Sequence, residues 1–442
     1  MPGNSAIVSN HLREIDVDGL RIGMYVAELD RPWLETPFLF QGFFIRAKSE
    51  IEELRQHCDF VLIDLEETDD KLLGPAKPLK SAKISKTASD GTAKKQSPWR
   101  RFIALFWRRK VSAIKTPAPG EFYQDTASVA DELVVARSVH SGSLREIMHT
   151  LERIRNGGTL QMPELEVVTE TMVDSVLRNS MAMALLARIR EKDDQMYAHS
   201  ISTSIWALVF GRHLGLNRES LKAVGLGALL LDVGKTKLPI DLLAKKGELT
   251  IVEKSYVRSH VELGLDVIRK TEGVDARVLD MVATHHERFD GSGYPKKLFG
   301  NQIPVFGRIG GIVDSYSAMT AETPYAPAMS SYDAMREFKA LSDKSFQSEM
   351  VEQFIQAIGI FPAGTLVELN TGEIAVVLKE HRLSRLQPEL AVIFGPDKEE
   401  LTDFRILDLL EQGTEPGTRP KAWIERGLKP GAYNIDPSKY FL

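Results

Sequence analysis

Residues 285–295 read HHERFDGSGYP, and this stretch decides how the middle of the chain is interpreted. Two neighbouring imidazoles, His285 and His286, are costly to bury unless something binds them. The glycines, serine and proline that follow predict a tight loop whose backbone can approach a bound phosphate or base closely. Tyr294 offers a ring face for stacking and a hydroxyl for hydrogen bonding. An ordinary Gly/Pro loop is the alternative, but the double histidine favours a site.

Further residues of metal-binding type lie on both sides of this stretch. Five of the ten histidines fall between residues 199 and 286. Imidazoles and carboxylates spaced across successive helices are what a divalent transition-metal site in a helical bundle requires. Taken singly, each histidine is also explained as a core residue with one hydrogen bond, which is how we interpret His213, His11, His57, His140, His149 and His381. The set expected to converge is His199, Asp232, His260, His285, His286 and Asp314.

Helical periodicity runs from about Thr126 to Ala357. Apolar residues recur at intervals of three and four over residues 164–190, 196–214 and 218–231, which predicts three helices. Prolines at positions 239, 295, 304 and 324 mark loops between the later helices. The sequence therefore predicts an all-α bundle over residues 126–361, of the kind that builds metal sites from facing helices.

Both ends of the chain have a β-like pattern instead. Residues 1–66 alternate short apolar runs with turn residues, and residues 48–58 between them have helical spacing. After Pro362 the period is two, and Asn370-Thr371-Gly372 separates two apolar runs as a hairpin turn does. Residues 390–394 give another strand. We expect a small β-rich N-terminal domain and a small β module with a tail over residues 362–442.

A basic linker is expected over residues 67–125. Residues 71–115 contain thirteen Lys or Arg, and Asp90 is their only acid. The first part cannot bury enough apolar area to fold and predicts a mobile tether. The second part, WRRFIALFWRRK at residues 99–110, fits either an interfacial segment on an anionic membrane or an apolar knot that packs on a neighbouring domain. We favour the second interpretation.

Bulk properties limit the classes of protein that fit. A chain of 442 residues is too long for one ordinary domain. Its net charge of -5 excludes a globally basic binder, so no nucleic-acid polymer is expected as a partner. Cys58, the single cysteine, excludes a disulfide framework and favours a reducing compartment. The start lacks the pattern of a secretory signal and no stretch has the apolar length of a membrane span, so we expect a cytoplasmic protein.

The motifs together resemble the HD-GYP branch of the HD phosphohydrolase superfamily. Besides HHERFDGSGYP, the matching motifs are Ala198-His199-Ser200, Asp232-Val233-Gly234-Lys235, Leu238-Pro239-Ile240-Asp241, Ser259-His260, and Arg308 leading to Asp314. The resemblance covers about residues 165–360. Residues 20–26 (LRIGMYV), with Trp33 ahead of Pro37-Phe38, resemble the uncharacterised domain that often precedes HD-GYP domains.

The resemblance implies an HD-type helical fold, bound iron, manganese or similar divalent ions, and hydrolysis of cyclic di-GMP to pGpG or GMP. It assigns the six converging residues as metal ligands, with Asp232 bridging two ions and Lys235 facing the scissile phosphate or leaving oxygen. An exposed lysine at a helix end is the alternative for Lys235. The resemblance also implies that the substrate contacts Asp290, Gly291, Gly293, Tyr294, Pro295 and Arg308.

Several positions depart from the family pattern. Leu231 stands where the family has the histidine of its His-Asp pair, and Gln195 stands where many relatives have a glutamate. Ser317 replaces an aspartate, and residues 323–327 (TPYAP) lack the family's phosphate-binding Arg and Lys. Lys296 and Lys297 could compensate, although exposed lysines are the simpler interpretation. Because leucine has no lone pair, we expect one tightly bound metal and a second that is weak or absent.

Two main hypotheses follow. The first is an enzyme, a cyclic di-GMP phosphodiesterase whose activity is intact or impaired. The second is a catalytically degenerate relative that acts in bacterial signalling as a cyclic di-GMP sensor or a protein-interaction module. Its partner would then be a GGDEF-type diguanylate cyclase or a second copy in a homodimer. A third, smaller alternative is hydrolysis of another nucleotide.

Overall fold

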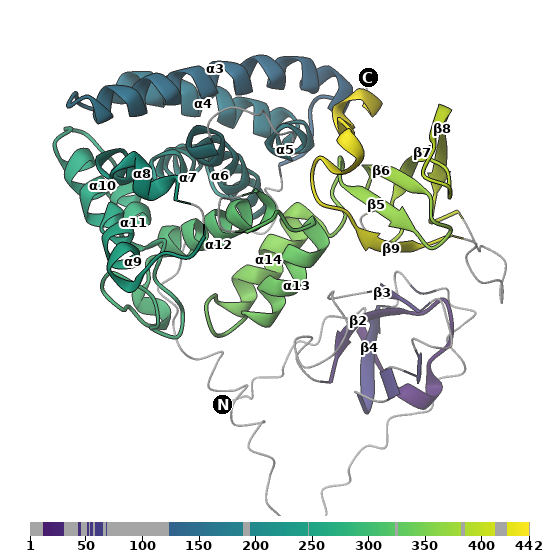
Figure 1. The fold of residues 1–442 in the computed structure, drawn as a ribbon. Helices are drawn as coiled ribbons and strands as arrows, with labels where there is room; N and C mark the ends of the chain where they lie inside the picture. Colours follow the sequence, from purple (N-terminus) through teal and green to yellow (C-terminus); the bar gives the residue numbers. More distant parts are fainter. Residues whose placement is uncertain are drawn as a thin grey trace, which may run out of the picture. The chain divides into compact units, whose positions relative to one another are not determined.

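The computed structural model describes residues 12–30, 43–45, 51–52, 54–55, 58–64, 68, 123–188, 195–245, 247–322, 326–381, 385–411 and 422–441. The chain forms two compact units, Met1–Pro119 and Gly120–Leu442, and each is described by itself (Figure 1). Most of the predicted linker, including residues 99–110, lies outside the described residues. Among the helices described, none is both long enough and apolar enough to cross a bilayer.

The first unit is a small antiparallel sheet, as the alternating pattern predicts. Its elements are β1 (Leu12–Asp16), η1 (Val17–Gly19), β2 (Tyr25–Leu29), β3 (Phe43–Phe44) and β4 (Phe60–Asp64), and the strand order is β1-β4-β2-β3. Alternate residues Val61 and Ile63 of β4 are fully buried, because successive side chains of a strand point to opposite faces. Ile51 and Leu54, from the stretch predicted to be helical, are helical in the structure and complete this core.

The second unit is mainly helical, as predicted. Its elements are α3 (Val129–Arg155), α4 (Met162–Arg178), α5 (Ser180–Arg188), α6 (Gln195–His213), α7 (Arg218–Leu230), η3 (Val233–Lys237), α8 (Ile240–Leu243), α9 (Ile251–Arg258), α10 (His260–Arg269), α11 (Ala276–Thr284), η4 (Gly300–Gln302), α12 (Val305–Thr320), α13 (Ser331–Ala340) and α14 (Ser348–Ile358). Side-chain caps from Ser128, Asn217, Thr250 and Ser330 bind free backbone N–H groups at helix starts.

One predicted helix is wrong in its extent. The apolar period over residues 164–190 continues through Asn179, but the structure ends α4 there and begins α5. Asn179 has extended backbone angles, with φ -157° and ψ 109°. Its side-chain oxygen accepts the N–H groups of Met181 and Ala182 at 3.0 and 3.2 Å, which caps the new helix. Local capping therefore overrides the continuous apolar pattern.

The helices that carry the predicted ligands meet around α7. This helix packs against α6 and α11, and α12 packs against both of those neighbours (Figure 1). An aromatic cluster lies between α6, α12, α13 and α14: Trp206 and Phe210 contact Tyr316 and Phe354, and Phe338 packs beside them. All five rings are buried, so their packing fixes the positions of α6, α12, α13 and α14 relative to one another.

The C-terminal β module is confirmed. Its strands are β5 (Leu366–Leu369), β6 (Ile374–Lys379), β7 (Glu389–Phe394), β8 (Glu400–Asp408) and β9 (Ile424–Gly427), in the order β8-β7-β6-β5-β9. Two short turns, η5 (Ala432–Asn434) and η6 (Pro437–Tyr440), follow. The predicted hairpin joins β5 to β6, pairing Leu366 with Val376 and Glu368 with Ile374. Gly372, at φ 85°, supplies the left-handed turn conformation.

A glutamate lies at the junction between the helices and this module. Glu380 Oε1 accepts the N–H of Phe361 at 3.0 Å, and burial raises the pKa of Glu380 to about 7. An unfolded glutamate ionises near 4.5, whereas the folded one keeps its proton up to about 7. Between these values the unfolded chain binds fewer protons, so the free energy of unfolding should fall as pH rises, by up to about 3 kcal/mol.

The Glu380→Gln variant tests this expectation. Glutamine keeps the acceptor for Phe361 but cannot ionise, so the free energy of unfolding of the variant should not show this pH dependence. Urea denaturation of wild type and variant at pH 5 and pH 8 measures the difference. We expect the variant to gain about 3 kcal/mol relative to wild type at the higher pH; parallel pH profiles would contradict the assignment.

Candidate metal centre

Two histidines have their tautomers set by backbone carbonyls three residues earlier. The Nδ1 of His260 lies 2.8 Å from the carbonyl oxygen of Val257, and the Nδ1 of His285 lies 2.8 Å from that of Val282. A carbonyl oxygen can only accept, so each Nδ1 carries the hydrogen and donates it. In the neutral ring the other nitrogen, Nε2, then presents a lone pair.

These lone pairs face one another. The Nε2 atoms of His260 and His285 lie 3.4 Å apart, and His260 Nε2 lies 3.4 Å from Asp232 Oδ1. No hydrogen is available between any of these atoms. Asp232 Oδ1 is also buried without a hydrogen-bond partner among the described residues. Buried electron pairs turned toward a common point fit a cation, which would satisfy all of them at once.

His286 completes this first group of donors. Its ring centroid lies 4.1 Å from that of His285 and 5.0 Å from that of His260. Asp232, His260, His285 and His286 each offer a ligand atom, and these atoms lie within 4.8 Å of one another. We call these four residues the three-histidine set.

A second group shares the same aspartate. His199, Asp232 and Asp314 also offer atoms within 4.8 Å of one another, and we call them the two-aspartate set. His199 Nε2 lies 2.9 Å from Asp314 Oδ1 and 3.7 Å from Asp232 Oδ2. Ser317 Oγ lies 3.1 Å from His199 Nδ1 and holds the back of the ring. The six residues expected from the sequence therefore lie together, with Asp232 common to both sets.

Both aspartates are held in the ionised form. Burial raises the pKa of Asp232. The positive charge of Lys235 and the neighbouring histidines His260 and His199 together lower it by more, so the net shift is downward. Burial raises the pKa of Asp314 as well, but the hydrogen bond from His199 and the attraction of His199, His286 and His285 together outweigh this effect, so its pKa falls well below the ordinary value. Two buried carboxylates thus carry negative charge at one place.

The histidines are held in the neutral form. Burial lowers the pKa of His285 to about 4 and also lowers that of His260. Burial, followed by repulsion from His285, lowers the pKa of His286 well below 6.5. Neutral imidazole is the form that binds a metal, because a protonated ring has no lone pair left. Three neutral imidazoles beside ionised Asp232 have the donor chemistry of a transition-metal site.

The sequence comparisons agree with this geometry. Residues 184–349 match the family of HD domains. This part of the chain is an HD domain. Residues 12–165 match a domain family of unknown function, DUF3391. The matched segment includes the first sheet and continues past residue 119 through α3. Within the HD domain lie the helices of both donor sets.

Several known proteins are similar to this chain. A cyclic di-GMP phosphodiesterase of Pseudomonas aeruginosa is 27% identical over 422 residues, which is 94% of each chain. A 3'3'-cGAMP-specific phosphodiesterase of Vibrio cholerae is 33% identical over 53% of this chain and 58% of its own. A solved structure described as an HDG"Y"P protein, from Bdellovibrio bacteriovorus, covers 78% of this chain and 98% of its own with a TM-score of 0.44 and 14% identity.

Lys235 of the HD domain reaches the shared aspartate. It lies on η3, and its Nζ donates to Asp232 Oδ2 at 2.6 Å. Gly234, the residue before it, packs so closely that an added Cβ would lie 1.9 Å from the carbonyl oxygen of His260. Glycine therefore allows η3 to approach α10 and brings Asp232, Lys235 and His260 together.

A buried glutamate, which the sequence reading missed, shapes the loop after the double histidine. Glu287 Oε1 accepts the N–H of Lys296 at 2.7 Å, and Oε2 accepts the N–H of Leu298 at 2.9 Å. The side chain is only 4% exposed, so both donors depend on it. Gly293 lies against this turn, where a Cβ would come 2.3 Å from the N–H nitrogen of Arg288. The signal was present in the motif, as an acid directly after two histidines.

Replacing Glu287 should therefore loosen the loop without removing a donor of either set. The Glu287→Ala variant leaves two backbone N–H groups unsatisfied, at a cost of about 1–3 kcal/mol each. We expect faster hydrogen exchange at Lys296 and Leu298, measured by mass spectrometry. Exposed Glu272→Ala serves as the control. Unchanged protection at both amides would show that other contacts hold the loop.

The loop residues that were predicted to contact substrate differ in their exposure and contacts. Tyr294 stacks on His286, with ring centroids 4.6 Å apart and 23° between the planes. One face of its ring, predicted to stack a base, is therefore turned toward a metal-site histidine. Asp290 and Pro295 are exposed, and Asp290 Oδ1 accepts the N–H of Ser292 at 2.9 Å. Gly291, at φ 80°, has the left-handed conformation that the turn needs.

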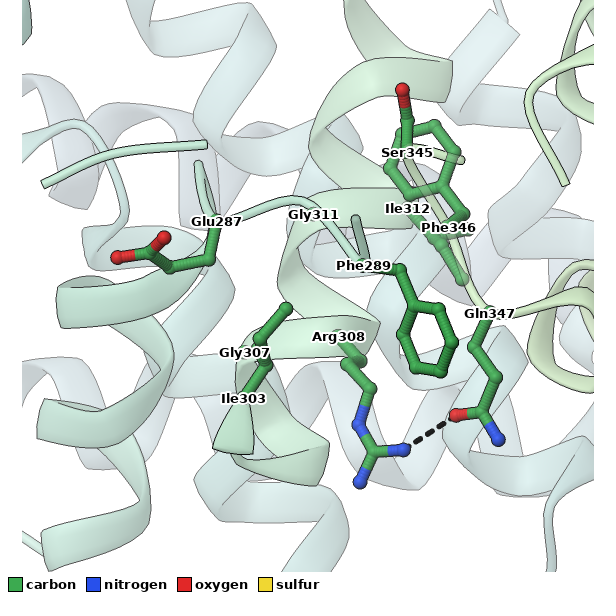
Figure 2. Close-up of a pocket in the computed structure, with 10 residues that line it drawn as sticks. All are labelled: Glu287, Phe289, Ile303, Gly307, Arg308, Gly311, Ile312, Ser345, Phe346 and Gln347. Atoms are coloured by element: carbon green, nitrogen blue, oxygen red, sulfur yellow. Dashed lines mark hydrogen bonds between the residues drawn. The ribbon is translucent and has the colours of Figure 1, made fainter. Parts of the chain in front are cut away.

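Arg308, expected to contact substrate, points elsewhere. Figure 2 shows its side chain beside Phe289, with a hydrogen bond to Gln347. Its Nη1 also donates to Asn301 Oδ1 at 3.3 Å. The adjacent backbone N–H groups of Phe289 and Asp290 donate to the carbonyls of residues 345 and 344. Arg308 thus lies where the loop contacts the turn before α14, and among the described residues its hydrogen bonds are to neither donor set.

The structure describes some of the positions that depart from the family pattern. Leu231 is 2% exposed and fills its position next to Asp232 with hydrocarbon. The side chain of Gln195 and residues 323–325 lie outside the described residues. Lys296 and Lys297 are exposed. The two-aspartate set therefore has three described donors, against four in the three-histidine set.

Proposed function

We propose that the HD domain hydrolyses a phosphodiester bond of a cyclic dinucleotide, with cyclic di-GMP as substrate and pGpG or GMP as product. One observation carries the proposal: lone pairs of buried neutral histidines converge on a buried carboxylate oxygen that has no hydrogen-bond partner among the described residues. The phosphodiesterase names of the similar proteins support the substrate class.

The donor sets divide the metal-binding role unequally. The three-histidine set would hold the tighter ion, iron or manganese, because it has four donors and neutral imidazole suits such metals. The two-aspartate set would hold a second ion weakly. A bound divalent ion supplies Lewis-acid chemistry: it lowers the pKa of a water and neutralises charge on phosphate. Asp232 orients its two oxygens toward the two sets.

The chain's own groups act around the phosphate. Lys235 Nζ, already 2.6 Å from Asp232, is placed to neutralise charge that develops on the leaving oxygen. The loop of residues 290–295, held by Glu287, brings backbone close to the substrate. Because burial keeps the histidines neutral, they remain donors down to mildly acidic pH.

Metal counting combined with product analysis tests the proposal. The protein is purified with manganese or iron, its metal content is measured by elemental analysis, and products from cyclic di-GMP and 3'3'-cGAMP are separated by chromatography. We expect at least one metal per chain and linear products that depend on the metal. A metal-loaded protein that leaves both cyclic dinucleotides intact would refute hydrolysis.

A second function, sensing without catalysis, is supported by Leu231. This buried side chain stands where the family resemblance places a metal-binding histidine, and the weaker set has only three described donors. A protein of this kind would bind cyclic di-GMP and signal through a diguanylate cyclase partner or a second copy of itself. Tight binding of cyclic di-GMP with no product formed would decide for the sensor.

Restoring the histidine tests the placement of the weaker site. In Leu231→His, an imidazole enters next to Asp232 and adds a donor, so we expect the metal content per chain to rise. Elemental analysis gives the content, and Leu231→Asn is the control because its amide adds polarity without an imidazole. An equal metal content in Leu231→His and wild type would contradict this placement.

A further inference from the structure

A cation lies at the outer edge of the metal centre. Arg258 ends α9, and its guanidinium carbon is 4.8 Å from the centroid of the Tyr294 ring. Tyr294 in turn stacks on His286 at 4.6 Å. The guanidinium is therefore two ring contacts away from a residue of the three-histidine set. Contact with the aromatic ring holds the guanidinium in place while its N–H groups remain available.

Arg258 is not used elsewhere in the described part of the chain. The side chain is exposed, and no ion pair or hydrogen bond joins its guanidinium to another described residue. The other cations near the site already have protein partners. Lys235 donates to Asp232, and Arg288 donates to the carbonyls of His285 and Glu287.

The proposed substrate needs a cation at such a position. A cyclic dinucleotide carries two phosphodiesters in a single ring, so when one lies at the metal donors the other must lie close by. The protein has no described carboxylate paired with Arg258 to compete for it. Guanidinium is suited to this contact because its planar N–H groups bind two phosphate oxygens together.

We propose that Arg258, held against Tyr294, binds the second phosphodiester, the one that is not cleaved, and thereby selects cyclic dinucleotides over substrates with a single phosphodiester. This inference rests on the proposed function and adds a residue that determines specificity. Tyr294 has a matching role: it connects the guanidinium to His286 and fixes the distance between the two phosphate positions.

The test compares two substrates. Cyclic di-GMP has two phosphodiesters, whereas bis(p-nitrophenyl) phosphate has one. In Arg258→Ala we expect KM for cyclic di-GMP to rise about tenfold or more, the loss of one charge-assisted contact, with kcat within about twofold. The kcat/KM for cyclic di-GMP relative to the single phosphodiester should fall by about the same factor. Arg258→Lys should recover part of the loss, because it keeps the charge but not the planar group.

The control is Lys254→Ala, which removes an exposed cation from the same helix. Its KM for cyclic di-GMP should equal that of wild type. Metal content and melting temperature of Arg258→Ala should also match wild type, since the side chain is exposed. Equal losses on both substrates, a fall in kcat alone, or an unchanged KM for cyclic di-GMP would each overturn the assignment.

Binding separates this inference from the proposed hydrolysis. If wild-type protein forms no product, the dissociation constant for cyclic di-GMP is measured by calorimetry in place of KM. A constant about tenfold weaker in Arg258→Ala than in wild type would then support Arg258 while the hydrolysis proposal fails. Wild type that neither binds nor cleaves cyclic di-GMP would refute both.

Discussion

Asp232→Ala is expected to abolish metal-dependent activity and to empty both donor sets. Asp232 is the only residue common to the two sets, and it is 5% exposed. Replacing a residue that merely orients a ligand typically costs 10–100-fold in metal affinity, so losing a shared donor should cost at least about a hundredfold. The variant also leaves Lys235 without its carboxylate partner at 2.6 Å. Elemental analysis and product chromatography on the same preparation measure both effects.

Two further variants make this result specific. Asp232→Asn keeps the volume but removes the charge, so it should lose nearly as much metal while remaining folded. Asp241→Ala removes an exposed carboxylate on α8, nine residues further along, and should retain metal and activity. If Asp232→Asn bound metal as tightly as wild type, the two sets would not share a ligand at this position.

Gly234→Ala is expected to have the second largest effect, although glycine has no side chain that could bind a metal or a phosphate. An added Cβ would lie 1.9 Å from the carbonyl oxygen of His260 and 2.5 Å from the backbone nitrogen of Gly264. Backbone cannot move aside as a flexible side chain does, so η3 and α10 must separate. Overpacking of this kind costs about 1–3 kcal/mol or more. The movement also draws Asp232 away from His260, and metal affinity should fall with stability.

Gly142→Ala is the matched control. Gly142 lies within α3, and a Cβ there would meet no atom within 4 Å. Alanine should stabilise this helix by about 0.5–1 kcal/mol. Urea denaturation of both variants with and without manganese gives the comparison. If Gly234→Ala lost stability but kept its metal affinity, the close packing of η3 would not be what sets the donor geometry.

The sequence predicted the arrangement wherever residue type and spacing carried the information. The strand alternation and the hairpin at Gly372 follow from local patterns, and the six converging residues were expected from their types and spacing together with the family resemblance. It failed at Asn179, because Met172, Val176 and Met183 keep a helical period across the break, and only the side-chain cap interrupts the helix. A period of apolar residues does not report a polar cap.

Other features depend on partners far along the chain. The direction of Arg308 is set by Gln347, and the motif around Arg308 contains no sign of that partner. Arg258 lies two residues before His260, yet its guanidinium contacts the ring of Tyr294, which belongs to the loop after the double histidine. The tautomers of His260 and His285 depend on carbonyls whose orientation only the helix ends determine. Tertiary contacts of this kind cannot be read from spacing.

The two donor sets draw on segments that are widely separated along the polypeptide, on α6, after α7, on α10, after α11 and on α12. An ion bound there acts as a reversible cross-link between parts of the chain that would otherwise drift apart on unfolding. By mass action, each tenfold increase in free ion above the dissociation constant adds about 1.4 kcal/mol to stability. Resistance of the helical unit to proteases should therefore increase with the concentration of free ion, independently of any nucleotide.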